Sequence, residues 1–222
     1  MSPSTALPAN LGVARERAAF PFLARVLRTP VRRVLERWFS LRVEGLEHLP
    51  AHGPYIVAAN HHNYLDGVIL AVTVPAPVAF LVMPRVYRAT LLHPSFHRHI
   101  GSIPINLQRP DVGALRRAVG ALERGRVVGI FPEGPFSVRG RLERGLPGVA
   151  LLALRSGAPV VPAGIAGTYE ALAARPWRLP RRHPLVVRFG PPRRFAPDGA
   201  GARTVRASVT QRIMDDIAAL LP

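Results

Sequence analysis

Cysteine and lysine are both absent from this chain of 222 residues. Without cysteine the chain has no disulfide, no thiolate nucleophile and no cysteine-ligated zinc or iron–sulfur centre. Without lysine it has no phosphate-binding loop of the usual glycine-rich form, and the G-x-S-x-G and H-E-x-x-H signatures of hydrolases and zinc proteases are missing too. These absences argue against thiol chemistry, nucleotide binding through a P-loop and the common hydrolases.

Long uncharged runs are scarce as well. The best of them, residues 67–83, contains Pro75 and Pro77, so we interpret it as a helix, a turn and a strand rather than a membrane span. The N-terminus lacks the basic start, apolar stretch and cleavage site of a signal peptide. We therefore expect a peripheral protein at the cytoplasmic face of the cell membrane.

Positive charge is what the chain has in excess. Its 30 basic residues are all arginine and outnumber 13 acidic ones, for a net charge of +17. Such a surface attracts the phosphates of nucleic acids, anionic bilayers or phosphorylated small molecules. The use of arginine alone also fits a genome-wide codon bias, which would leave the charge excess unchanged.

Residues 20–39 carry an amphipathic pattern in which apolar residues at helical spacing alternate with arginines and end near Trp38. The pattern is typical of a helix in the headgroup layer of a membrane, although a helix packed on its own domain would also fit. Pro30 should divide it into two helices. We therefore predict a flexible tail at 1–13, amphipathic membrane-interface helices at 14–40 and the main domain at 41–222.

Short apolar runs in the main domain alternate with helical patterns. The predicted strands are 41–43, 55–59, 78–83, 103–105, 127–131, 160–165 and 185–189. The predicted helices are 68–74, 112–124, 149–155 and 204–221, the second capped by Asp111. This alternation predicts an α/β fold with a mixed, largely parallel sheet covered by helices on both faces.

The segment from Asn60 to Gly67 directly follows the predicted strand 55–59, and ligands of such sheets bind at the carboxyl ends of strands. On one straight helix His61 and Asp66 would lie roughly 140° apart, so they meet only if the chain turns before the helix begins. If they meet, Asp66 orients the imidazole and His61 acts as a general base. Alternatively, Asp66 merely caps the helix.

Two further segments carry chemical groups. Glu133 stands in a Phe-Pro-Glu-Gly turn after the strand 127–131, either as a held carboxylate or as an exposed turn residue. Arg109 follows the strand 103–105 and could form a bidentate contact with a phosphate. The histidines at 93, 97 and 99 have no nearby carboxylates, so we predict no metal site.

Four sequence blocks together are similar to those of the phospholipid/glycerol acyltransferase family, in its 1-acylglycerol-3-phosphate O-acyltransferase (lysophosphatidic acid acyltransferase) branch. The blocks are N-H-x-x-x-x-D at 60–66, G-S-I-P-I with Arg109 at 101–109, F-P-E-G at 131–134 and V-V-P-A at 160–163. They occur in the family's order and approximate spacing, and the resemblance covers about residues 40–190.

The resemblance implies an acyltransferase of the glycerol-3-phosphate acyltransferase-like fold, in which His61 is the general base and Asp66 orients it. A hydroxyl of the acceptor, 1-acylglycerol 3-phosphate, then attacks the thioester of acyl-CoA or acyl carrier protein to give phosphatidate, without a cofactor. The residues that the resemblance assigns to the acceptor's phosphate site are Arg109, Phe131, Pro132, Glu133, Gly134, Ser137 and Arg139.

Two departures from the family pattern both affect the acceptor site. Phe-Pro-Glu-Gly usually continues Thr-Arg-Ser, but here it continues with Pro135, Phe136 and Ser137, so Arg139 or Arg141 is left to replace the missing arginine. Three residues, 106–108, also separate the second block from its arginine. A different lysolipid or hydroxylated lipid therefore stays open as the acceptor.

Two interpretations from other classes also stay open. The sequence pI of about 11.8 would suit a nucleic-acid-binding domain. The arginines, however, form no dense stripe beyond the pairs Arg181–Arg182 and Arg193–Arg194, and we expect no nucleic-acid partner. An inactive relative could serve as a membrane scaffold, against which the intact His61 and Asp66 argue.

Overall fold

A central sheet of seven strands organises the computed structural model, which describes residues 22–83, 97, 100–106, 111–172, 179–196 and 202–222. The strands are β1 (Arg42–Glu44), β2 (Tyr55–Ala59), β3 (Val78–Val82), β4 (Ile103–Pro104), β5 (Val127–Ile130), β6 (Val160–Ala166) and β7 (Val186–Phe189). Their order is β1-β7-β6-β2-β5-β3-β4, and every neighbouring pair is parallel except β6 and β7. The predicted mixed, largely parallel sheet is confirmed.

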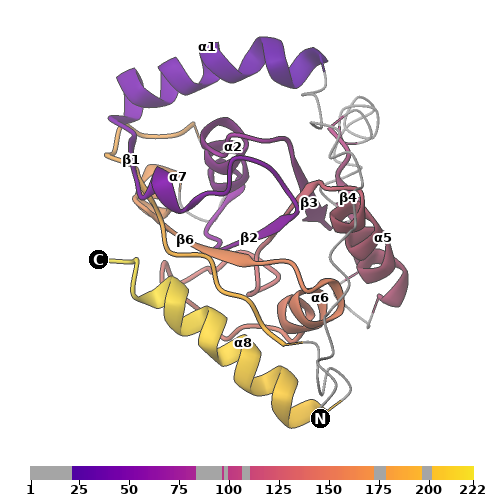
Figure 1. Ribbon diagram of the computed structural model, residues 1–222. Coiled ribbons are helices and arrows are strands. Elements are labelled where there is room, and N and C mark those ends of the chain that lie inside the picture. Colours follow the sequence, from indigo (N-terminus) through magenta and orange to yellow (C-terminus); the bar gives the residue numbers. More distant parts are fainter. Residues whose placement is uncertain (1–21, 84–96, 98–99, 107–110, 173–178, 197–201) are drawn as a thin grey trace, which may run out of the picture.

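Helices cover both faces of this sheet (Figure 1). They are α1 (Phe22–Phe39), α2 (Tyr64–Thr73), α5 (Val112–Glu123), α6 (Gly148–Ser156), α7 (Thr168–Leu172) and α8 (Arg203–Ala218), with a 3₁₀ turn η1 (Leu46–His48). One hydrophobic core contains residues of α1, α2 and α7, and the other contains residues of α5, α6 and α8. The sequence predicted neither α7 nor η1, because both are too short to show the hydrophobic periodicity of a helix.

Strand β2 shows why the central strands are apolar without alternation. All five of its side chains are fully buried. Tyr55, Val57 and Ala59 pack into the core under α2, whereas Ile56 and Ala58 pack into the core under α6 and α8. Successive side chains of a strand point to opposite faces, so a doubly covered strand must be apolar at every position.

Helix α1 runs unbroken through Pro30, so the prediction of two helices divided at this residue was wrong. Pro30 lies on the exposed side of the helix, where water can bond to the carbonyl that loses its partner, and helices often continue on both sides of such a proline. None of the described helices is long and apolar enough to cross a membrane.

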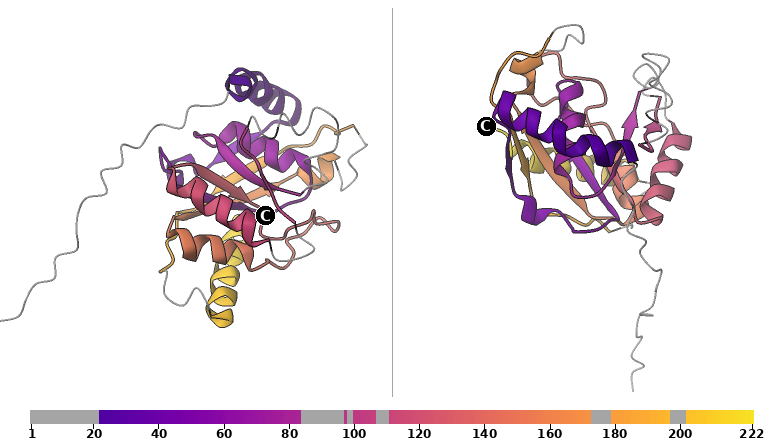
Figure 2. Two further views of the ribbon diagram at one scale, coloured as in Figure 1. Left: turned by 90° about the vertical axis from the view of Figure 1, so that its right-hand side faces the viewer. Right: turned by 90° about the horizontal axis from the view of Figure 1, so that it is seen from above.

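One stripe of α1 packs on the domain and the other faces solvent. Leu35 and Phe39 are buried, and Arg28 donates a hydrogen bond of 2.6 Å from Nη1 to the carbonyl of Val74 at the end of α2. Seen from above, α1 crosses over the layer of the domain that contains α2 (Figure 2). Large apolar side chains nevertheless stay exposed on its outer side: Phe22, Val26, Leu27, Val34 and Trp38.

Candidate active site

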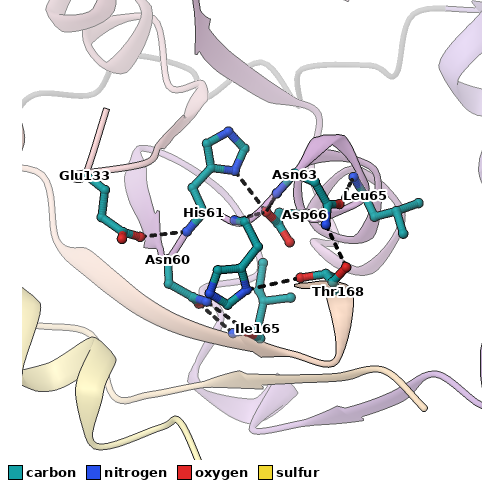
Figure 3. Close-up of polar contacts among 9 residues, drawn as sticks. Asn60, His61, Asn63, Leu65, Asp66, Glu133, Ile165 and Thr168 are labelled. Carbon is teal, nitrogen blue, oxygen red and sulfur yellow. Dashed lines mark hydrogen bonds and ion pairs between the residues drawn. The ribbon is translucent and has the colours of Figure 1, made fainter. Parts of the chain in front are cut away.

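The candidate site lies where three neighbouring parallel strands end. His61 follows β2, Glu133 follows β5 and Thr168 follows β6, and β2 lies between the other two strands in the sheet. Figure 3 shows the side chains from these three segments converging around His61 and Asp66. The carboxyl ends of parallel strands share one edge of a sheet, which brings together residues that lie about 100 positions apart in the chain.

His61 and Asp66 are in direct contact. The distance from His61 Nδ1 to Asp66 Oδ2 is 2.9 Å, and the same oxygen accepts hydrogen bonds from the backbone N–H groups of His62 (2.6 Å) and Asn63 (2.8 Å). Helix α2 begins only at Tyr64, so the chain does turn between the two residues, as their spacing required. Asp66 is fully buried, and three donors on one oxygen hold it in a single position.

Asp66 also takes part in the cap of α2, so its pairing with His61 and its capping role occur together. Asn63 is the N-cap, and its side-chain oxygen accepts the backbone N–H of Leu65 at 2.9 Å, while Asp66 accepts the backbone N–H of Asn63 in return. This capping box starts α2 four residues before the predicted Val68. Its signal, an Asn followed three residues later by an acid, was present in the sequence and was missed.

The contact with Asp66 decides which nitrogen of His61 is available for chemistry. A carboxylate only accepts hydrogen bonds, so Nδ1 carries the proton and Nε2 keeps its lone pair. The His61 side chain is only slightly exposed, whereas Asp66 is not exposed at all. The pair is therefore arranged for one proton transfer at Nε2.

Aromatic rings enclose the imidazole. Phe131 stacks on the His61 ring with centroids 3.7 Å apart and an angle of 7° between the planes. Phe136 meets the same ring edge-on at 4.5 Å, and Tyr64 meets Phe136 at 4.8 Å. Phe136 occupies the position at which the family resemblance expects an arginine, so the surroundings of the base are more apolar than the motif suggests.

Glu133 holds the backbone of the site. Its Oε1 accepts the backbone N–H of His61 at 2.7 Å, and its Oε2 accepts that of Glu143 at 2.7 Å. Burial raises the pKa of Glu133 from 4.5 to about 7, against the opposing effect of these two hydrogen bonds. Both oxygens are thus engaged by the protein itself, and the part of Glu133 in acceptor binding stays a prediction.

The loop after β5 also contacts His61 through the carbonyl group of this residue. The backbone N–H of Ser137 donates to the carbonyl of His61 at 2.8 Å, and the Ser137 hydroxyl donates to the carbonyl of Arg141 at 2.7 Å. The loop turns at Gly134, whose φ of 82° is a backbone conformation that residues other than glycine rarely adopt. Glu133 and Ser137 together fix the peptide groups on both sides of His61.

A second set of contacts, which the sequence did not reveal, supports the site from β6 and α7. The Asn60 side chain donates to the carbonyl of Ile165 (2.8 Å) and accepts its N–H (2.7 Å). The Asn63 amide donates to the carbonyl of Thr168 at 2.6 Å, and His62 Nδ1 lies 3.4 Å from Thr168 Oγ1. No local pattern marks Thr168, because only the sheet order brings it beside β2.

The remaining residues predicted for the site are Pro132, Arg139 and Arg109. Pro132 is buried, and its carbonyl accepts the backbone N–H of Leu146 at 2.7 Å. Arg139 is exposed, whereas Arg109 lies outside the described residues. Within the described parts of the chain, no group of three or more His, Asp or Glu side chains could hold a metal ion.

Comparisons with solved structures agree with the fold. A crystal structure of the 1-acyl-sn-glycerophosphate (LPA) acyltransferase of Thermotoga maritima matches with a TM-score of 0.70 over 89% of this chain and 80% of that one, at 23% identity. At this identity the likeness concerns the fold alone.

Relatives by sequence include uncharacterized proteins of Mycobacterium bovis and Mycobacterium tuberculosis, 30% identical over 171 residues. The match covers 67% of this chain but only 43% of these relatives, so the chain spans less than half their length. A 1-acyl-sn-glycerol-3-phosphate acyltransferase of Bacillus subtilis is 26% identical over 132 residues, which are 58% of this chain and 63% of that protein.

A family model gives the assignment itself. The model described as Acyltransferase matches residues 40–166, more than half of the chain. The matched region contains the pair His61 and Asp66 and the carboxylate of Glu133. The chain belongs to the Acyltransferase family.

Proposed function

We propose that the protein transfers a fatty acyl chain from a thioester donor, acyl-CoA or acyl carrier protein, to the free hydroxyl of 1-acylglycerol 3-phosphate and so forms phosphatidate. The 2.9 Å contact between His61 Nδ1 and Asp66 Oδ2 at the end of β2 is the observation that carries the proposal. Family membership supports acyl transfer, and the acceptor is inferred from the activity for which relatives such as the Bacillus subtilis protein are named.

In the proposed reaction His61 Nε2 removes the proton from the acceptor hydroxyl while the oxygen attacks the thioester carbonyl carbon. The new C–O bond forms, the C–S bond breaks, and the imidazolium returns the proton to the departing thiolate. Asp66 holds the ring and stabilises its positive charge during the transfer. No protein nucleophile and no cofactor take part, since the acceptor oxygen attacks directly.

Helix α1 supports a peripheral position at the membrane, where lipid acceptors are found. Its outer side combines exposed Phe22, Val26 and Trp38 with arginines, the pattern of a helix that lies in the headgroup layer. In this proposal the protein binds the cytoplasmic face of the cell membrane through residues 22–39. The acceptor's phosphate would be bound by Arg109 and Arg139.

One observation favours a second candidate acceptor. Phe136 packs edge-on against the ring of His61 at 4.5 Å and against Tyr64, so an apolar ring lies beside the base. A lysolipid or other hydroxylated lipid with a neutral group next to its hydroxyl would suit this surface better than a phosphate. The reaction at His61 would be the same.

The test is acyl transfer from long-chain acyl-CoA, and separately from acyl carrier protein, to lysophosphatidate, glycerol 3-phosphate, lysophosphatidylcholine and monoacylglycerol. We expect a product that the wild type makes and the His61→Ala variant does not. His52→Ala is the matched control, because His52 is exposed in the loop before β2. Equal turnover by wild type and His61→Ala would disprove the mechanism, whereas the preferred acceptor decides between the two candidates.

A further inference from the structure

A shallow hollow lies beside the C-terminal half of α1, and none of its lining residues belongs to the candidate active site. Its volume is about 250 Å³, and its lining consists of Arg33, Val34, Arg37, Trp38 and Arg182. Four of these residues come from α1, whereas Arg182 comes from the segment that precedes β7. The tertiary structure thus adds a third arginine to two that the helix already presents.

Arg182 is held in place by an aromatic ring. Its guanidinium carbon lies 4.6 Å from the centroid of the Trp38 ring, a cation–π contact. A guanidinium that stacks on a ring keeps its N–H groups free to point sideways at an anion. The contact with Trp38 favours a position of Arg182 in which its N–H groups can reach an anion in the hollow.

Three of the five residues that line the hollow are arginines, and none of these five lining residues is acidic. Arg33 and Arg37 stand four residues apart on one helix, a spacing at which like charges repel. The neighbouring Arg32 pairs with Glu36 at 2.8 Å, but within the described residues no carboxylate forms an ion pair with Arg33, Arg37 or Arg182. Three such guanidinium groups around one hollow favour an anion that accepts several hydrogen bonds, which is the chemistry of a phosphate.

The surroundings of the hollow indicate that this phosphate belongs to a lipid. Trp38 is 51% exposed and Val34 59%, and the exposed apolar side continues along α1 to Val26 and Phe22. A free phosphate or a nucleic-acid backbone has nothing to place against such a stripe, whereas a bilayer offers phosphate and hydrocarbon side by side.

We propose that the hollow formed by Arg33, Arg37, Arg182 and Trp38 is a binding site for the phosphate headgroup of an anionic phospholipid in the bilayer. It rests on the part of the proposed function that places α1 at the membrane, and it does not depend on acyl transfer. The hollow makes docking selective for anionic membranes, beyond what the apolar stripe alone would provide.

The test measures binding of the full-length protein to vesicles of pure phosphatidylcholine and to vesicles that also contain phosphatidylglycerol, by co-sedimentation at physiological salt. We expect Arg37→Gln and Arg182→Gln each to weaken binding to the phosphatidylglycerol vesicles by about tenfold or more, as loss of a charge-assisted hydrogen bond should. Binding to pure phosphatidylcholine should change little. Emission of Trp38, in a background that carries Trp177→Phe, should shift on binding to the anionic vesicles.

Two arginines serve as matched controls. Arg25→Gln removes the same charge from α1 but outside the hollow, and Arg212→Gln removes it from α8, which packs on the opposite face of the sheet (Figure 1). We expect Arg25→Gln to lower the affinity for phosphatidylglycerol vesicles by at most about fivefold, which is the effect of one surface charge near an anionic bilayer. Arg212→Gln should leave this affinity unchanged.

Three outcomes would overturn the proposal. Equal losses for Arg25→Gln and Arg37→Gln would mean that charge alone attracts the helix, without a site. Equal binding of the wild type to both kinds of vesicle would exclude an anionic phospholipid as the ligand, but it would be compatible with α1 lying at the membrane interface. If the hollow variants instead lose affinity for a duplex DNA fragment and keep vesicle binding, the ligand is nucleic acid.

Discussion

Glu133 holds His61 through the backbone rather than through the imidazole. Its Oε1 accepts the His61 N–H at 2.7 Å, and its other oxygen accepts the N–H of Glu143, so the carboxylate joins the end of β2 to the loop that follows β5. The family resemblance placed Glu133 in the acceptor site, but its contacts support a role as a positioning residue. Enzyme kinetics can distinguish acceptor binding by Glu133 from positioning of His61.

The Glu133→Gln variant should lower kcat by about tenfold to a hundredfold, because an amide nitrogen would face one of the two N–H groups and displace His61. KM for the acceptor should change little if Glu133 only positions the base. Glu143→Gln is the control, because the hydrogen bond from Glu143 to Glu133 comes from the backbone N–H, which this substitution keeps. A large rise in acceptor KM at normal kcat would instead return Glu133 to the acceptor site.

The same carboxyl predicts a pH dependence of stability. Its pKa rises from 4.5 to about 7 on folding, so between these pH values the folded protein holds a proton that the unfolded chain releases. The contribution of Glu133 to stability is therefore complete below pH 4.5 and declines as the pH rises to 7. The difference in unfolding free energy between wild type and Glu133→Gln should fall by roughly 3 kcal/mol across this range. Urea unfolding at several pH values measures it, and a constant difference would contradict the raised pKa.

Asp66→Asn should reduce kcat by about 10²- to 10⁴-fold, since the amide no longer fixes the His61 tautomer or stabilises the imidazolium. Single-turnover transfer separates this effect from product release. Asp111→Asn is a suitable control, because Asp111 caps a different helix, α5, by accepting the backbone N–H of Ala114. An Asp66→Asn enzyme with near-normal single-turnover rates would exclude the proposed pair.

Phe136→Arg should shift acceptor preference toward phosphate. The new guanidinium would stand beside His61, where Phe136 now lies at 4.5 Å, and could bind a phosphate near the reacting hydroxyl. We expect KM for lysophosphatidate to fall by about tenfold relative to KM for monoacylglycerol, as one charge-assisted contact would give. Phe136→Leu controls for loss of the ring, and unchanged relative KM values would separate Phe136 from acceptor choice.

Tyr55→Phe should leave the free energy of unfolding unchanged or raise it by up to about 1 kcal/mol, because the buried Tyr55 hydroxyl has no hydrogen-bond partner within the described structure. Tyr55→Ala should cost about 3–5 kcal/mol, since it leaves a cavity at the start of β2. Thermal and urea unfolding of both variants provide the comparison. A marked loss of stability in Tyr55→Phe would show that the hydroxyl has a partner after all.

The fold was largely decided by patterns that are local in the sequence. The apolar run 55–59 became β2 without a change of bounds, and Asp111 caps α5 as its position before the helical pattern indicated. Burial on both faces of a parallel sheet needs continuous apolar strands, and helices need caps, so each element carries its own signal. At Pro30 the local pattern was misleading, because an exposed proline can be accommodated within one continuous helix.

The candidate site depended on tertiary structure to a greater degree. The sequence singled out His61, Asp66 and Glu133 by type and spacing, but whether His61 meets Asp66 depends on the turn before Tyr64. The contacts from Thr168 to Asn63 and from Arg182 to Trp38 join residues more than 100 positions apart. No local pattern encodes them, because strand order and helix docking, which follow from packing the whole chain, determine which distant residues become neighbours.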